Sequence, residues 1–276
     1  MKKLKVNQIY QGDSSRLLAD KKLFPSNSVD LIVTSPPYAD RRRKTYKGVS
    51  PAKYVEWFMP FADQMYRVLG PKGSLILNIK ESVNDGERNT YVLELILKMR
   101  EEGWVWVEDY IWHKKNTFPG LWPNRFRDAW EHCLHFTKDK HFKMYQDAVK
   151  VPIGDWAESR MKKLGKNDKI RIDSKTNSGF GRKLTNWEGK RKVYPSNVLY
   201  MSTISANKNH SAVFPEALPS WFIKLFSKKG DVVLDPFLGS GTTAVAALRL
   251  DRNYLGIELD KKYYKISKTS VAKAKR

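Results

Sequence analysis

Four consecutive residues, Ser35, Pro36, Pro37 and Tyr38, have the types and spacing to do chemistry, and they lie just after the apolar run of residues 29–33. The Ser35 hydroxyl and the Pro36 carbonyl can both accept hydrogen bonds from an amine. Consecutive prolines stiffen the backbone, so the Pro36 carbonyl keeps its direction. Tyr38 adds a flat aromatic face. Taken alone, the four residues predict either a polar site for an amine or an ordinary proline turn.

A second stretch suited to chemistry is the glycine-rich loop DPFLGSGTT, residues 235–243. Gly239 and Gly241 allow backbone to pass close to a ligand, and Thr242 and Thr243 are expected to cap the helix that follows. The next predicted strand ends at Glu258, whose carboxylate can accept hydrogen bonds from ribose hydroxyls. No lysine follows the glycines, which argues against a triphosphate site. The G-x-G-x-x-A pattern leaves open a dinucleotide site or a tight turn without a ligand.

The charge of the chain favours a polyanionic partner. Among 276 residues, 51 are Lys or Arg and 29 are Asp or Glu, giving a formal net charge of +22. Phosphate contacts by such side chains dominate nucleic-acid binding, although a merely soluble basic protein would show the same balance. The single cysteine, Cys133, allows no intrachain disulfide, which fits a reducing cytosol. No signal peptide or membrane-spanning stretch is expected.

The elements that must position the two loops alternate between strand and helix. Strands are predicted at 29–35, 74–80, 104–113, 129–138, 231–237 and 252–260, with a turn at 71–73. Helices are predicted at 51–70, 89–103, 215–230, 241–251 and 261–275, and Pro60 is expected to kink or divide the first of them. This order predicts an α/β fold, a mostly parallel sheet with helices on both faces.

The alternation fails between residues 138 and 192, where 16 Lys and Arg stand against seven Asp and Glu. The aromatic residues in or beside this segment include Trp156, Phe180, Trp187 and Tyr194. Aromatic residues among basic ones favour an inserted region that contacts nucleic acid over a solvated loop.

Together the two loops resemble the catalytic and cofactor motifs of the amino-methylating DNA methyltransferases that use S-adenosylmethionine. The catalytic motif comes first here, as in the beta, circularly permuted group. The resemblance implies a Rossmann-like twisted sheet, with residues 1–139 and 196–276 forming the catalytic and cofactor-binding domain and residues 140–195 a target-recognition region. It implies double-stranded DNA as substrate, no metal, a monomer or homodimer, and a prokaryotic cytosol. A restriction-modification role would add a cognate endonuclease as partner.

The resemblance also implies roles for individual residues. QGDSSRLL is similar to the motif whose acid, Asp13, meets the cofactor's adenine, and Glu258 in GIELD would hold the ribose. The segment before the glycine loop would close the methionine end of the pocket. The implied cofactor-binding residues are Asp13, Asp235, Phe237, Gly239, Ser240, Gly241, Thr242, Glu258, His210 and Pro215. RFRDAWEHCLHFTK, residues 125–138, resembles a late motif near the target base.

The first letter of the catalytic motif distinguishes the base. Members with serine there mostly methylate cytosine N4, and those with aspartate adenine N6, so Ser35 implies cytosine and leaves adenine as the alternative. The base must leave the duplex to be reached, and Tyr38 would stack on it. A basic cluster just after the motif would hold the DNA backbone: Arg41, Arg42, Arg43 and Lys44.

Other assignments remain open or are disfavoured. An NAD-dependent oxidoreductase would explain only the glycine loop, and a DNA-binding protein without activity would leave both motifs unused. A methyltransferase for RNA or protein fits the motif order less well. His132 and His135 lack the further ligands that a metal needs, and Asn78 and Lys80 either border the site or mark a strand edge. The tryptophans at 104, 106 and 112 are expected in the core.

Overall fold

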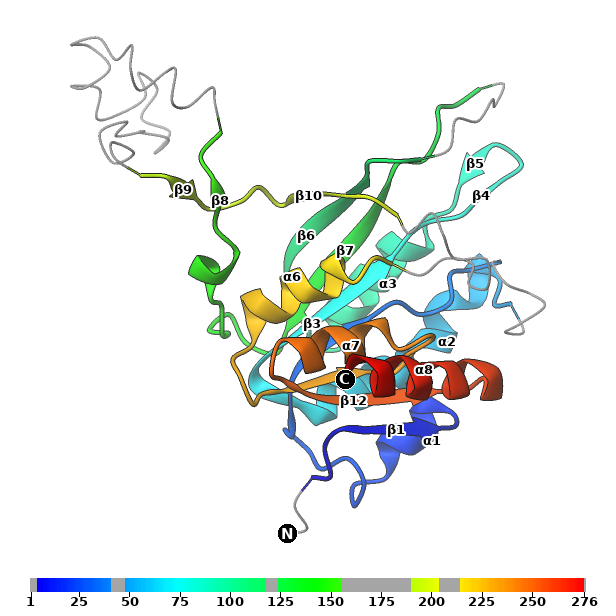
Figure 1. The fold of residues 1–276 in the computed structure, drawn as a ribbon. Helices are drawn as coiled ribbons and strands as arrows, with labels where there is room; N and C mark the ends of the chain where they lie inside the picture. Colours follow the sequence, from blue (N-terminus) through cyan, green and yellow to red (C-terminus); the bar gives the residue numbers. More distant parts are fainter. Residues whose placement is uncertain (1–3, 41–47, 118–123, 155–189, 204–213, 276) are drawn as a thin grey trace. The chain divides into compact units, whose positions relative to one another are not determined.

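The computed structural model describes residues 4–40, 48–117, 124–154, 190–203 and 214–275. The chain divides into two compact units: residues 1–145 with 197–276, and residues 146–196. The larger unit contains the sheet and both loops identified above (Figure 1).

An eight-stranded sheet forms the centre of the larger unit, in the order β1-β12-β11-β2-β3-β7-β6-β10. Only β7 runs antiparallel to its neighbours, β3 and β6, while the other adjacent pairs are parallel. The strands are β1 (Gln8–Gln11), β2 (Val29–Thr34), β3 (Leu69–Ile79), β6 (Val105–Lys114), β7 (Trp130–Thr137), β10 (Val198–Met201), β11 (Val232–Asp235) and β12 (Asn253–Glu258). A hairpin of β4 (Val83–Asn84) and β5 (Glu87–Arg88) lies outside this sheet.

Helices cover both faces of the sheet (Figure 1). One layer packs α1 (Ser14–Ala19) against α2 (Pro51–Val68) and α2 against α3 (Tyr91–Glu101). The other packs α6 (Ala217–Phe226) against α7 (Thr242–Arg249) and α7 against α8 (Lys261–Ala274). The predicted α/β class is therefore confirmed. Within the described ranges, no helix combines the length and apolar character needed to span a bilayer.

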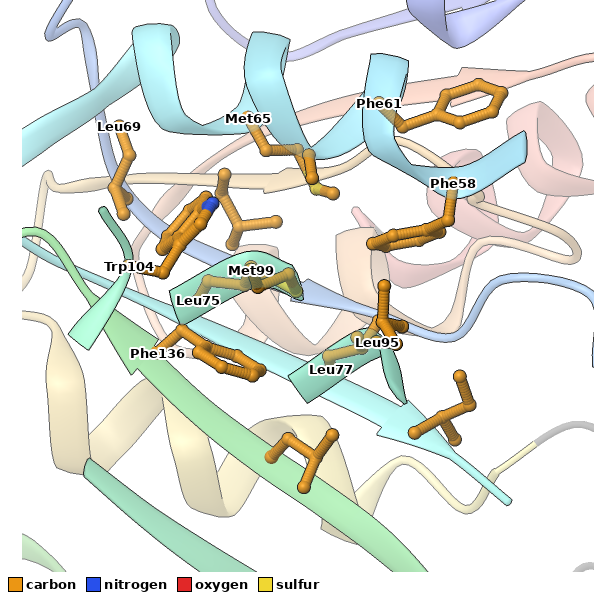
Figure 2. Close-up of a cluster of buried hydrophobic side chains, with 14 of the residues drawn as sticks. Phe58, Phe61, Met65, Leu69, Leu75, Leu77, Leu95, Met99, Trp104 and Phe136 are labelled. Carbon is orange, nitrogen blue, oxygen red and sulfur yellow. The ribbon is translucent and has the colours of Figure 1, made fainter. Parts of the chain in front are cut away.

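The main hydrophobic cluster lies between α2, α3 and the sheet (Figure 2). Tyr54, Phe58 and Met65 recur at helical spacing along α2 and are fully buried. They belong to the same cluster as Leu77 of β3 and Phe136 of β7, which are also fully buried. Burying each such side chain stabilises the fold by about 1.5–3 kcal/mol. The helix layer of α2 and α3 therefore packs against the sheet whose strand β2 leads into the catalytic motif.

Two predictions of local structure are wrong, and at Pro60 one of the two expected outcomes, division of the helix, is excluded. The helix at Pro60 is not divided, because α2 continues from Pro51 to Val68 with its buried face intact on both sides of the proline. The turn expected at 71–73 is an irregularity within β3, where pairing with β2 shifts register between Val29 and Leu31. Trp106 is 40% exposed rather than in the core. The strands β1 and β10, at the two edges of the sheet, had not been predicted.

The smaller unit contains a short 3-10 helix, Gln146–Val149, and a two-stranded ladder of β8 (Val151–Pro152) with β9 (Lys192–Val193). Asp147 accepts a hydrogen bond from the Tyr194 hydroxyl at 3.1 Å and pairs with Lys150 at 2.7 Å. The Lys150 ammonium also lies over the Tyr194 ring. These contacts join the two ends of the basic segment, whose other aromatic residues, Trp156, Phe180 and Trp187, lie outside the described residues.

Candidate active site

The two loops begin side by side at the carboxyl ends of two neighbouring inner strands. β2 ends at Thr34 and its parallel neighbour β11 ends at Asp235. The chain then leaves β2 toward α2 on one face and β11 toward α7 on the other. In open α/β sheets, ligands bind at such a switch in direction beyond the carboxyl ends of the strands. The structure therefore places the Ser35–Tyr38 turn and the glycine loop next to each other, at the ends of adjacent parallel strands.

Asp235 connects the two loops. Its carboxylate accepts hydrogen bonds from Thr34 Oγ1 at 2.6 Å and Thr243 Oγ1 at 2.7 Å, and from the Phe237 amide at 3.1 Å. The residue is 2% exposed, and this burial raises the pKa of the Asp235 carboxyl to about 6. Since Thr34 directly precedes Ser35, one buried carboxylate fixes the start of the catalytic turn relative to α7.

The glycine loop uses its two glycines differently. Gly239 has φ +57° and an open flank, where an added Cβ would meet only Phe237 O, at 4.0 Å. Gly241 has φ +94° and packs on α8, where a Cβ would come within 3.1 Å of Ser267 Cα. Gly241 itself occupies the cap position of α7 without a side-chain cap, so the expected capping by Thr242 or Thr243 is wrong. Ser240 and Thr242 hydroxyls lie 3.5 Å apart.

Glu258 and Asp13 lie next to this loop. The Glu258 carboxylate, 2% exposed, accepts the Gly239 amide at 2.7 Å and the Asp260 amide at 2.8 Å. Asp13 caps α1 through Oδ1, which accepts the amides of Ser15 and Arg16. The neighbouring Gly12 amide donates to the Glu258 carbonyl at 3.0 Å. The first residues of α1 are therefore tied to the end of β12.

Three further residues of the expected cofactor set are Phe237, Pro215 and His210. Phe237 packs against the aromatic face of α2, with its ring 5.0 Å from that of Phe61 and 6.1 Å from that of Trp57. Pro215 precedes α6, and its carbonyl accepts the Leu218 amide at 2.9 Å. His210 lies outside the described residues, as do the four basic residues at 41–44.

The catalytic turn is held by hydrogen bonds to α2 and to β7. The Tyr54 hydroxyl, from α2, donates to the Pro37 carbonyl at 3.0 Å. The Tyr38 hydroxyl donates to Glu131 Oε2 at 2.7 Å, and Ser35 Oγ lies 3.4 Å from the same Tyr38 oxygen. Burial, and then the Glu131 charge, raise the pKa of Tyr38 well above its usual value, so its hydroxyl stays protonated. The turn therefore has a fixed backbone and an ordered polar face.

Comparison with known proteins identifies the family. The family model described as DNA methylase, N6_N4_Mtase, matches residues 29–269, which include both loops. The chain belongs to this DNA methylase family. The type II methyltransferase M.PvuII of Proteus hauseri is 31% identical over 279 aligned residues, covering 92% of this chain and 80% of that protein. M.BglII of Bacillus subtilis is 29% identical, covering 95% of this chain and 68% of its own length.

Solved structures agree with this membership. The PvuII DNA methyltransferase, cytosine-N4-specific by name, superposes with a TM-score of 0.72 at 26% identity and covers 97% of this chain and 86% of its own. A protein from Thermus thermophilus, named as a DNA modification methylase and complexed with S-adenosyl-L-methionine, has a TM-score of 0.63 at 25% identity, covering 98% of this chain and 94% of its own.

Sequence reasoning about this DNA methylase missed Glu131. It belongs to the 125–138 segment, for which only a general place near the base had been expected. Its Oε1 pairs with the Lys114 ammonium, and its Oε2 accepts both the Tyr38 hydroxyl and, at 3.1 Å, the Asn78 amide. A glutamate within the apolar run of β7 was the available signal, since buried acids are rare unless paired. Asn78 accordingly borders the catalytic turn.

The two histidines of β7 have separate roles in this DNA methylase. His132 bonds Asp109 through Nδ1 at 2.8 Å and Glu81 through Nε2 at 2.7 Å. Burial alone would lower the His132 pKa, but these carboxylates raise it to about 9. Burial lowers the pKa of His135 to about 3, and its Nε2 meets Ser74 Oγ. Among the residues described, no cluster of three His, Cys, Asp or Glu could hold a metal.

Proposed function

We propose that this DNA methylase transfers a methyl group from S-adenosylmethionine to the exocyclic N4 amine of cytosine within a specific duplex site. The observation that carries the proposal is the link that Asp235 makes between the two motifs: it accepts hydrogen bonds from Thr34, directly before Ser35, and from Thr243, the last residue of the glycine loop. An amine acceptor beside a nucleotide-type loop suits methylation of a base. The likeness to a cytosine-N4-specific enzyme supports the choice of cytosine.

The residues of the turn act by positioning the amine. The lone pair of an exocyclic amine is delocalised into the ring, so the nitrogen is a poor nucleophile. Ser35 Oγ and the Pro36 carbonyl would each accept one N–H, which orients the nitrogen and favours its pyramidal form. Tyr54 fixes the backbone next to that carbonyl through Pro37. Bound S-adenosylmethionine supplies an electrophilic methyl group on a sulfonium.

The chain offers a donor and acceptor set that fits this cofactor. The open side of Gly239 leaves room for a ligand against the backbone. The buried Glu258 carboxylate at the end of β12 is the acceptor that ribose hydroxyls need. Asp13 is held beside it by the bond from Gly12 to Glu258. The cofactor bound to the Thermus relative supports the same assignment.

DNA would be held by the basic residues of the chain. The net charge of +22 supports a polyanion, and we assign Arg41, Arg42, Arg43 and Lys44 to the backbone near the base and residues 140–195 to target recognition. Tyr38 would stack on the extruded cytosine. Flipping costs a few kcal/mol, which these contacts must offset.

The type II names of the relatives support a restriction-modification role, with a cognate endonuclease, in a prokaryotic cytosol. We propose a monomer or homodimer.

Methylation of adenine N6 is the second candidate, because the family name covers both amines. Product analysis separates the two. The protein is incubated with duplex DNA of varied sequence and labelled S-adenosylmethionine, and the DNA is digested to nucleosides. We expect the label in N4-methylcytosine. Label in N6-methyladenine would refute the base, and unlabelled DNA would refute the function.

Replacement of Ser35 tests the assigned site. Ser35→Ala removes one acceptor of the amine, and we expect kcat to fall roughly 10- to 100-fold, the scale of one strong hydrogen bond, while S-adenosylmethionine affinity is unchanged. Ser202→Ala, at an exposed serine, is the matched control. Turnover of Ser35→Ala at the wild-type rate would contradict the role of Ser35.

A further inference from the structure

We propose that Glu131 is a positioning residue, which orders the hydroxyl groups of Tyr38 and Ser35 so that Ser35 presents its oxygen to the amine. The inference rests on the function proposed for the Ser35–Tyr38 turn. Glu131 lies on the antiparallel strand β7, outside both loops.

Strand register brings the partners of Glu131 to one face of the sheet. Glu131 lies directly opposite Trp112 on β6, and Lys114 is two residues further along that strand. On the other side, Asn78 of β3 lies opposite Cys133, two residues from Glu131. Side chains two apart on a strand share a face. β7 therefore carries a carboxylate between an ammonium and an amide, both anchored on neighbouring strands.

The burial of this carboxylate makes its bonds specific. The Glu131 side chain is 10% exposed and the Lys114 side chain 18%. A buried charge needs a charged partner and further hydrogen bonds to be retained. Lys114 meets Oε1, whereas Tyr38 and Asn78 both meet Oε2. Each carboxylate oxygen is thus committed, and the group is fixed in place.

An ionised carboxylate can only accept hydrogen bonds, so it sets the direction of the protons along the chain of hydroxyls. The Tyr38 hydroxyl has two acceptors within reach, Glu131 Oε2 at 2.7 Å and Asn78 Oδ1 at 3.2 Å, and it donates its one proton to the nearer, charged Glu131. The Tyr38 oxygen is then an acceptor for the Ser35 hydroxyl, which lies 3.4 Å away. With its proton turned toward Tyr38, Ser35 Oγ directs its lone pairs elsewhere, where the amine can donate to them.

The test compares the kcat of single and double variants after wild-type methylation has been measured. Tyr38→Phe keeps the aromatic ring and removes only the hydroxyl, and Glu131→Gln keeps the shape and removes the charge. We expect each to lower kcat roughly 10- to 100-fold, as the loss of a hydrogen bond to a charged group implies. KM for DNA and the affinity for S-adenosylmethionine should stay within about threefold of wild type. The surface variant Glu101→Gln is the control for charge loss.

The double variant distinguishes ordering from independent effects. If Glu131 acts through Tyr38, Glu131→Gln combined with Tyr38→Phe should be no slower than the slower single variant. Multiplied losses, a wild-type kcat in either single variant, or losses confined to KM would overturn the proposal. If the unfolding of Glu131→Gln is not cooperative, the variant has not folded properly and Glu131→Asp replaces it in the test. Glu131→Asp keeps the charge but moves the carboxylate back by one methylene. A reduced kcat then supports the proposal, and a wild-type kcat overturns it.

The result is separable from the proposed function. A wild-type protein that methylates no DNA, or only adenine, refutes that function before any variant is compared. A wild-type protein that methylates cytosine while Tyr38→Phe is equally fast refutes only the inference about Glu131.

Discussion

Raising the pH is expected to weaken the fold through His132. The ring is held between Asp109 and Glu81, and its pKa is raised from 6.5 to about 9. A group whose pKa is higher in the folded state contributes stability that is fully present below its unfolded pKa and is lost as the pH rises through its folded pKa. The free energy of unfolding should therefore fall between about pH 6.5 and 9.5.

The size of this loss follows from the pKa difference. Each pKa unit corresponds to about 1.36 kcal/mol, so a rise from 6.5 to about 9 predicts a loss of about 3 kcal/mol. This is an upper value, because 10% of the His132 side chain remains exposed. Other charges face the same site: Arg88 contacts Glu81, and Lys80 acts on it as well. Comparing wild type with the His132 variant at each pH cancels the contribution of these other charges to the free energy of unfolding.

Urea unfolding at about pH 6.5, 7.5, 8.5 and 9.5 measures the effect. His132→Gln removes the titrating ring, and His141→Gln at an exposed position is the matched control. Wild type and His141→Gln should lose up to about 3 kcal/mol more than His132→Gln over this range. A difference between wild type and His132→Gln that stays constant with pH would refute the reasoning.

Two further predictions concern the glycine loop. Gly241→Ala places a Cβ against Ser267 in a left-handed conformation, at a cost of about 1–3 kcal/mol, and calorimetry should show S-adenosylmethionine affinity lowered at least tenfold. The control is Gly230→Ala, at φ +84° with open space around it, which should leave that affinity unchanged. Equal losses of affinity in the two variants would contradict the packing argument. Wild-type kcat should fall below about pH 6, where Asp235 protonates and loosens its bond to Thr34, although the raised pKa means that protonation does not weaken the fold. Asp235→Asn should be slower and lack this fall, and an unchanged profile would be evidence against it.

The fold class was predictable because periodicity records which faces are buried. The runs that became β2 and β11 are mostly apolar, as expected of strands covered on both faces. Their order along the chain also placed the two loops at strand ends. Division of the helix at Pro60 was expected as one outcome because local propensity ignores the packing that keeps α2 continuous on both sides of the proline.

The residues of the candidate site were predictable only where they belong to motifs of consecutive residues. The pairing of Asp235 with Thr34 spans 201 residues, and that of Glu131 with Tyr38 spans 93. Such contacts depend on strand order and register, which periodicity does not report. Glu131 and Asn78 therefore became part of the site only through the reversed strand β7 and its neighbour β3.

The position of β11 in the sheet has a consequence for biosynthesis. β11 lies between β2 and β12, and β1 pairs with β12, so early strands are completed by strands made nearly last. At roughly 5–20 residues per second, β2 leaves the ribosome roughly 10–40 s before its partner is made. During that time its edge is unpaired and prone to join other chains. A chain terminated before β11 loses two interior strands of the sheet, β11 and β12, so truncation should yield aggregation rather than partial activity.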